Sequence, residues 1–160
     1  MTQHKVGIAE AAVCDKNDTI ITIGLGSCVG VCLYDSIKKI AGMVHVMLPD
    51  STNTKNNSNR FKFADTGVAD LIANMERSGA SKLKMTAKIA GGAQMFTSSN
   101  ASDIMKIGER NVDAVKQQLK NHGIRIIAED TGDSFGRTIE FFAEDGSLAV
   151  KSIKFGKKVI

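Results

Sequence analysis

The chain has 160 residues, of which 42% are hydrophobic and 24% charged, and it carries a formal net charge of +4. This length suits one domain with a self-sufficient core, and the balance of apolar and charged residues excludes a disordered chain. No run of about 18 apolar residues is present, so we expect no membrane insertion, and the absence of a signal-like segment predicts a cytoplasmic protein. Aromatic residues make up only 5% of the chain. Because none of them interleaves with a basic run, we expect no nucleic acid partner.

The first half of the chain is typical of short strands. Apolar or alternating runs predict strands at 6–13, 19–25, 29–35 and 40–48. Polar turn clusters separate these runs, so we expect them to form a meander. A segment rich in Asn, Ser and Thr follows at 50–59, and its length and composition predict a mobile loop that either closes over a site or frays.

The second half mixes helices with strands. Apolar residues at helical spacing predict helices at 64–78 and 108–121. Further strands are predicted at 83–89, 124–129, 138–143 and 148–155. Asp145 and Gly146 give a hairpin signal between the last two strands. This order of elements predicts a single α+β domain over residues 1–160, with a mixed, largely antiparallel sheet and two main helices.

Three cysteines, an odd number, argue against disulfides in a chain expected in the reducing cytosol. Cys32 falls in a strand that is apolar on both faces, so we interpret it as a core residue. Cys14 lies at a strand end with no nearby partner, and we interpret it as inert. Cys28 differs because Gly24 and Gly26 precede it, and such a turn can expose a thiol and aim backbone N–H groups at a reacting oxygen. The pattern alone leaves both a plain glycine turn and a nucleophile open.

A nucleophilic cysteine needs a histidine within hydrogen-bond reach. We expect His4 in a frayed N-terminus, and His122 at the end of a helix, where a protonated ring would favourably meet the helix dipole. His45 stands in the middle of the strand 40–48 among methionines, where an imidazole needs a polar partner. That partner is either a backbone carbonyl or Cys28 on a neighbouring strand.

Thr22 and a metal site complete the alternatives. Thr22 could orient the imidazole as the third member of a catalytic set, or it could serve only as a good strand former. Cys28, Cys32 and His45 could instead bind zinc, but a second Cys-x-x-Cys or a His pair is missing from the sequence. We therefore expect no metal and no cofactor.

Six segments carry a resemblance to a known family, and together they span nearly the whole chain. They are TIGLGSCVGVCLYD (22–35), GMVHVMLP (42–49), FADTGVADLIANM (63–75), KIAGGAQMF (88–96), IGERNVDAV (107–115) and EDTGDSFGRTIEF (129–141). In these motifs and in their order, the chain resembles the CheD family of chemoreceptor glutamine deamidases.

The resemblance implies a cysteine hydrolase that converts selected glutamine side chains of methyl-accepting chemotaxis receptors to glutamate and releases ammonia. It implies a covalent thioester mechanism, with Cys28 as the nucleophile, His45 as the general acid and base, and Thr22 as the residue that orients His45. Some members of the family also act as receptor methylesterases. The implied fold is a layered α/β/β sandwich, similar to toxin deamidases of the cytotoxic necrotizing factor type.

The resemblance also implies a regulatory partner, the phosphatase CheC, which acts on the phosphorylated response regulator CheY. An alternative function is that of a regulatory binding partner of CheC, with deamidation secondary or lost. If the protein is a deamidase, backbone N–H groups near Gly26 and Ser27 could stabilise the oxyanion. The segment with Gly91, Gly92 and Gln94 could contact the substrate or a partner, or it could form a strand-to-loop turn.

Overall fold

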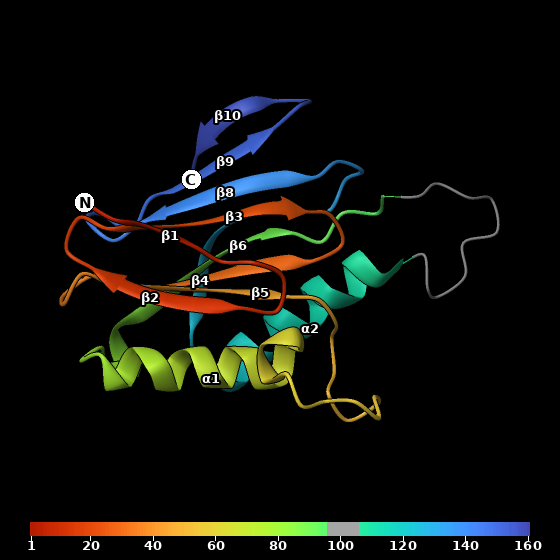
Figure 1. The fold of residues 1–160 in the computed structure, drawn as a ribbon, viewed down its shortest axis with the longest axis horizontal. Helices are drawn as coiled ribbons and strands as arrows, with labels where there is room; N and C mark the ends of the chain where they lie inside the picture. The colour runs from red at the N-terminus through yellow and green to blue at the C-terminus, as the bar shows by residue number, and fades with distance from the viewer. Residues whose placement is uncertain (96–105) are drawn as a thin grey trace.

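The computed structural model describes residues 1–95 and 106–160. Within this part of the chain, two five-stranded sheets and two α-helices form three layers, with both helices on one face of one sheet (Figure 1). The expected α+β class with two main helices is therefore confirmed. The sheet predicted from the sequence is, however, two separate sheets packed face to face.

The first sheet, which we call sheet A, forms one outer layer. Its strands lie in the order β1 (Gln3–Lys5), β3 (Thr19–Leu25), β8 (Arg137–Phe142), β9 (Leu148–Ser152) and β10 (Gly156–Val159). Only the pair of β1 and β3 is parallel among these neighbours. Gly146, in the turn between β8 and β9, has a φ of +74°, as the hairpin signal predicted.

The second sheet, sheet B, lies between sheet A and the helices. Its strands lie in the order β2 (Ala11–Asp15), β5 (Ile40–Val46), β4 (Val29–Asp35), β6 (Met85–Gly91) and β7 (Arg125–Thr131). The helices that cover it are α1 (Ala64–Arg77) and α2 (Ile107–Asn121), and two short 3-10 helices, η1 (Arg60–Lys62) and η2 (Lys82–Lys84), precede α1 and β6. Only β6 and β7 pair in parallel within this sheet.

The alternation of side chains along β4 explains why its sequence is apolar on both faces. Val31 and Leu33 pack in the core between sheet B and the helices, whereas Cys32 and Tyr34 pack in the core between the two sheets. All seven residues of β4 are buried. A central strand between two cores has no solvent-facing side, and this removes the usual alternation of apolar and polar residues.

The meander predicted for the first half of the chain is wrong. β3 and β4 follow one another in sequence and coincide with the predicted strands 19–25 and 29–35, yet β3 belongs to sheet A and β4 to sheet B. The chain crosses from one sheet to the other through residues 24–28, which include the end of β3. We call this segment the nucleophile loop, after the role predicted for Cys28. Only the antiparallel pair of β4 and β5 remains from the expected meander.

The predictions at the chain ends also need correction. The strand expected at 6–13 is replaced by β1 and β2, which join different sheets. The strand expected at 148–155 ends at Ser152 as β9, and β10, which was not predicted, follows it. His4 lies in β1 beside Asp18, with 3.2 Å between its Nε2 and a carboxylate oxygen, so the expected frayed N-terminus is also wrong.

The polar segment 50–59 is attached at both ends. Ser51 donates a 2.7 Å hydrogen bond from its hydroxyl to Asp65 in α1, and Asn59 donates from its side-chain amide to the carbonyl of Ala9 at 3.3 Å. Its mobility stays a prediction.

Candidate active site

Cys28 lies at the end of the nucleophile loop, immediately before β4. The pairing of β3 with β8 shifts register between Thr22 and Leu25, and Gly24 has a φ of +78° in this irregular stretch. A β-bulge bends a strand and increases its twist, and a positive φ favours glycine. Pairing with β8 resumes at Leu25, after which the chain leaves sheet A and reaches the half-buried Cys28 before β4. Of the two glycines seen in the sequence, Gly24 thus has the conformation that requires glycine.

Three successive carbonyl groups of the nucleophile loop are held by other segments. The donors are two backbone amides that follow β6 and one side-chain amide from α2. The pairs are Ala93 N with Gly26 O at 2.9 Å, Asn111 Nδ2 with Ser27 O at 2.9 Å, and Gly92 N with Cys28 O at 2.8 Å. With each of these carbonyls bonded, the peptide planes around the thiol have a defined orientation.

His45 lies in β5 with its side chain in the space between the two sheets. It is fully buried, and its backbone exchanges hydrogen bonds with the chain before β2, through Ala9 N and Glu10 O. Gly30 stands opposite His45 in the register of β4 and β5. A Cβ atom at Gly30 would lie 2.6 Å from a methyl carbon of Ile139 in sheet A, so a larger residue would require the Ile139 side chain to shift where the sheets approach beside the imidazole.

Thr22 reaches His45 from the opposite sheet. Its Oγ1 lies 2.8 Å from His45 Nδ1 and 2.6 Å from the carbonyl oxygen of Val6. A carbonyl can only accept, so the single hydroxyl proton of Thr22 goes to Val6, and the hydroxyl oxygen accepts from Nδ1–H. In the neutral ring the other nitrogen, Nε2, then carries the lone pair. This nitrogen is buried and has no hydrogen-bond partner among the described residues.

The strand register places Cys28 on the same side of sheet B as His45. Gly30 is the partner of His45, and Cys28 precedes Gly30 by two residues, so both project toward sheet A. Diagonal neighbours of this kind lie roughly 7 to 8 Å apart in an antiparallel pair, within reach of longer side chains. Cys28 also packs against the apolar cluster between the sheets. The structure thus brings the predicted hydroxyl and imidazole into contact, and it places the predicted thiol on the same side of sheet B without a hydrogen bond to the imidazole.

Burial shifts the protonation of both reactive groups toward the neutral forms. Desolvation lowers the pKa of His45 from 6.5 to about 4. Desolvation also raises the pKa of Cys28, and the backbone N–H of the same residue offsets part of this shift. At neutral pH the resting site therefore contains a thiol and a neutral imidazole rather than an ion pair, so the imidazole is available as a base.

The remaining cysteines and histidines lie outside this arrangement. Cys32 is fully buried and burial raises its pKa strongly, and burial together with Asp18 and Asp15 raises the pKa of Cys14 to about 12. Both are poor nucleophiles, which agrees with the interpretation of Cys32 as a core residue and of Cys14 as inert. His122 is the C-cap of α2, and there burial and then Lys82 lower its pKa, so the expected protonated ring is not favoured.

The segment with Gly91, Gly92 and Gln94 leads from β6 past the nucleophile loop. Gly91 has a φ of +111°, and a Cβ atom on it would lie 2.2 Å from the Cys28 carbonyl oxygen. Gly92 has a φ of +66° and packs so closely against α2 that a Cβ atom on it would also clash. Both glycines are buried. Their burial favours a supporting role beneath Cys28. Gln94 is only half-buried, and its backbone N–H donates to the carbonyl of Asp133.

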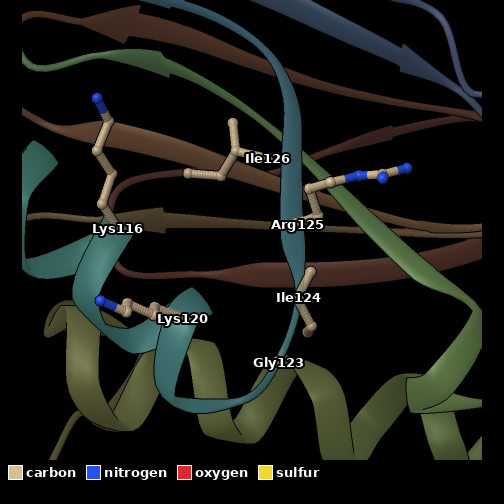
Figure 2. Close-up of a pocket in the computed structure, with 6 residues that line it drawn as sticks. All are labelled: Lys116, Lys120, Gly123, Ile124, Arg125 and Ile126. Carbon is tan, nitrogen blue, oxygen red and sulfur yellow. The ribbon is translucent and has the colours of Figure 1, made fainter.

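A pocket of about 360 Å³ lies elsewhere, at the C-terminal end of α2. Figure 2 shows Lys116 and Lys120 extending from α2 beside it, with Arg125 on the neighbouring strand. The pocket lining has no thiol and no imidazole, so it offers none of the chemistry at Cys28. Residues 1–95 and 106–160 contain no cluster of His, Cys, Asp and Glu suited to a metal ion, and no helix long and apolar enough to cross a membrane.

Two residues beside the site were missed in the sequence. Gly30 was not singled out although it stands opposite His45. Asn111 was also overlooked, although a signal was present. The signal is that Asn111 interrupts the apolar spacing of α2, where it is fully buried. A polar residue on the buried face of a helix requires a partner, and that requirement points to the backbone groups of a neighbouring segment.

Comparison with known sequences agrees with the resemblance found in the motifs. A sequence model described as CheD chemotactic sensory transduction matches residues 47–152. The probable chemoreceptor glutamine deamidase CheD of Caldanaerobacter subterraneus subsp. tengcongensis is 56% identical over 156 residues, which cover 98% of this chain and 96% of that protein. The chemoreceptor glutamine deamidase CheD of Bacillus subtilis is 51% identical over 157 residues, covering 98% and 95%.

Among solved structures, the hypothetical protein YfiH of Bacillus licheniformis overlaps 76% of this chain and 49% of that one, with a TM-score of 0.47 and 16% identity. This likeness is too distant to inform the function, and the similarity to toxin deamidases stays a prediction. The full-length relatives and the family match lead to one conclusion: the chain belongs to the CheD family.

Proposed function

We propose that this protein deamidates selected glutamine side chains of methyl-accepting chemotaxis receptors, with Cys28 as the nucleophile. Both relatives described above are named as chemoreceptor glutamine deamidases, and each aligns with nearly the whole chain. The geometry around Cys28 fits amide hydrolysis through a covalent intermediate. The proposed reaction converts the carboxamide to a carboxylate and releases ammonia.

In the first half of the reaction, Cys28 Sγ attacks the carboxamide carbon while His45 Nε2 accepts the thiol proton. The C–S bond forms, the carbonyl π bond opens, and the oxygen becomes an oxyanion. The backbone N–H of Cys28 lies beside its own sulfur and is the donor best placed for that oxygen, and the nearby amide of Ser27 is a further candidate. The N–H of Gly26, also considered from the sequence, already donates to the carbonyl of Gly24 at 3.1 Å. The protonated imidazole then transfers its proton to the departing nitrogen, the C–N bond breaks, and a thioester remains.

In the second half, water attacks the thioester while His45 Nε2 accepts one of its protons. The C–S bond breaks, the glutamate side chain leaves, and the proton returns to sulfur. A base that is neutral at rest serves both halves, because it must be unprotonated at the start of each. Thr22 assists by keeping the proton of the neutral ring on Nδ1.

One observation carries this proposal: the Thr22 hydroxyl bridges Val6 O and His45 Nδ1, which leaves a buried Nε2 with a free lone pair on the side of sheet B that Cys28 shares. A histidine that served only to fill the core would be expected to use both ring nitrogens when buried.

The test is ammonia release from a purified cytoplasmic fragment of a chemoreceptor, with mass spectrometry of receptor peptides to locate each glutamine converted to glutamate. Cys28→Ala should abolish both signals. Cys14→Ala is the matched control, because it removes a thiol from outside the site and should keep the activity. Wild-type rates from the Cys28→Ala protein would rule out the mechanism.

Three further proposals rest on the family resemblance rather than on the geometry of the site. They are hydrolysis of receptor methyl esters by the same thiol, regulation through CheC, and a cytoplasmic location. The set of Thr22, Cys28 and His45 argues against a purely regulatory role, which would not require it. Measuring CheC phosphatase activity with wild-type and Cys28→Ala protein separates the two roles, since a regulatory contact should survive loss of the thiol.

A further inference from the structure

Asn111 is a buried polar residue on the apolar face of α2. Its Nδ2 donates to Ser27 O at 2.9 Å and to Met47 O at 3.0 Å. Both partners are carbonyl oxygens, so both amide protons are used. The other end of the same amide, Oδ1, is buried without a partner among the described residues. An orphaned acceptor of this kind costs about 1 to 3 kcal/mol, which offsets part of what the two Nδ2 hydrogen bonds contribute to stability.

The two carbonyls that Asn111 holds belong to the two segments that carry the proposed reactive groups. Ser27 precedes Cys28 in the nucleophile loop, and Met47 follows His45 by two residues at the end of β5. The ladder of β4 and β5 joins these segments as far as Val29 and Val46, and Asn111 extends the connection beyond that last pair. One side chain thus links the loop to the strand end.

The hydrogen bond to Ser27 O also sets the direction of an N–H group. The carbonyl of Ser27 and the N–H of Cys28 belong to one planar trans peptide, in which they point in opposite directions. Because Asn111 draws the carbonyl toward α2, the N–H is turned away from the helix. The N–H of Cys28 lies beside its own sulfur, where the oxygen of a carbonyl attacked by that sulfur would develop its charge.

We propose that Asn111 is a positioning residue of the active site, which holds the Ser27–Cys28 peptide so that the Cys28 N–H faces the developing oxyanion. This inference rests on the proposed function and goes beyond it by assigning a residue that acts through the peptide plane. Asn111 touches no substrate atom in this role. Its effect is therefore confined to steps in which an oxyanion forms.

The experiment compares two reactions of the same thiol in wild type and Asn111→Leu, a variant of similar volume without the amide. Deamidation of the receptor fragment requires an oxyanion, whereas alkylation of Cys28 by iodoacetamide is a displacement at carbon that forms none. We expect kcat for deamidation to fall about tenfold to a hundredfold, since one misdirected donor costs less than the 10²- to 10³-fold typical of a donor removed outright. KM and the Cys28 alkylation rate should each stay within about threefold of wild type.

Val115→Ala is the matched control for stability. Val115 is fully buried on the same helix and is not among the residues that hold the nucleophile loop. It should lower the melting temperature while leaving kcat per folded molecule within about twofold of wild type. Should Asn111→Leu fail to fold, Asn111→Ser replaces it, because a serine hydroxyl can bond to a carbonyl of its own helix but is too short to hold Ser27 O.

Two results would overturn the proposal: a kcat within twofold of wild type in folded Asn111→Leu or Asn111→Ser, or a parallel fall of deamidation and alkylation. The second result would mean that the variant displaces the thiol itself. A wild-type protein that releases no ammonia from the receptor would instead overturn the proposed function, so the two failures are distinguishable.

Discussion

Thr22→Val tests whether the hydroxyl, rather than the shape, of residue 22 supports catalysis. Valine replaces the hydroxyl with a methyl group of similar size, so packing between the sheets is preserved. Two buried groups lose their partners, namely the carbonyl of Val6 and Nδ1–H of His45. Each orphaned group costs about 1 to 3 kcal/mol, and the added methyl returns about 1 kcal/mol, so we expect a loss of about 1 to 5 kcal/mol in the free energy of unfolding.

The effect on activity has a separate cause. Without an acceptor at Nδ1, the neutral ring is free to carry its proton on Nε2, and a ring in that form cannot accept the thiol proton. General base help is worth about 10²- to 10⁴-fold, and a partial loss of the correct tautomer should lower kcat about tenfold to a hundredfold.

The assay is ammonia release from the receptor fragment at a temperature where circular dichroism shows every variant to be folded. Thr22→Ser is the matched control, because it keeps the hydroxyl and loses only the methyl group. We expect serine to retain kcat within about threefold of wild type. If valine supported the same kcat as serine, the hydroxyl would have no catalytic role and the reasoning on the tautomer would be refuted.

Two further predictions concern stability. The pKa of His45 falls from 6.5 to about 4 on folding, so below pH 6.5 the unfolded chain binds the extra proton, and the stability from this group declines by about 3 kcal/mol as the pH drops to 4. Urea unfolding should show a shallower loss between pH 7 and 4.5 in His45→Gln than in wild type, and equal slopes would contradict the burial of a neutral ring. Gly91→Ala should lower both the melting temperature and kcat, because its Cβ would lie 2.2 Å from the Cys28 carbonyl. Gly123 has a φ of +72° with open space around it. Gly123→Ala should therefore lower the free energy of unfolding only by the cost of a left-handed alanine, about 1 to 2 kcal/mol, and keep its activity.

Local patterns predicted the elements of this fold better than their arrangement. Residues 19–25 and 29–35 were predicted as strands with the bounds that β3 and β4 have, because each run is short, apolar and ended by turn residues. Their assignment to one meander failed, because no local signal states that a chain leaves one sheet and enters another. The crossing follows the last pair of β3 with β8, and that partner strand lies more than a hundred residues later in the chain.

The candidate site residues differ in how far the sequence near each one could point to it. Cys28 stood out through Gly24 and Gly26, which are its neighbours in sequence. His45 was one of three histidines until the family resemblance selected it. Thr22 had no signal of its own, because a threonine in a strand is ordinary, and its role depends on a contact between sheets that pattern analysis did not foresee.

The crossing between sheets also bears on how these residues would act together in the proposed mechanism. A serial meander would put Thr22 and His45 in one sheet, where side chains of neighbouring strands lie side by side rather than facing one another. In this fold Thr22 projects from sheet A and His45 from sheet B, so the hydroxyl meets the ring across the buried space and Nε2 is left for the thiol. The nucleophile loop is the connection between those sheets, and it delivers Cys28 to the open end of the same space. The crossing that the predicted meander lacked is thus the feature that puts Thr22 on one sheet and Cys28 at the start of a strand of the other, as the proposed active site requires.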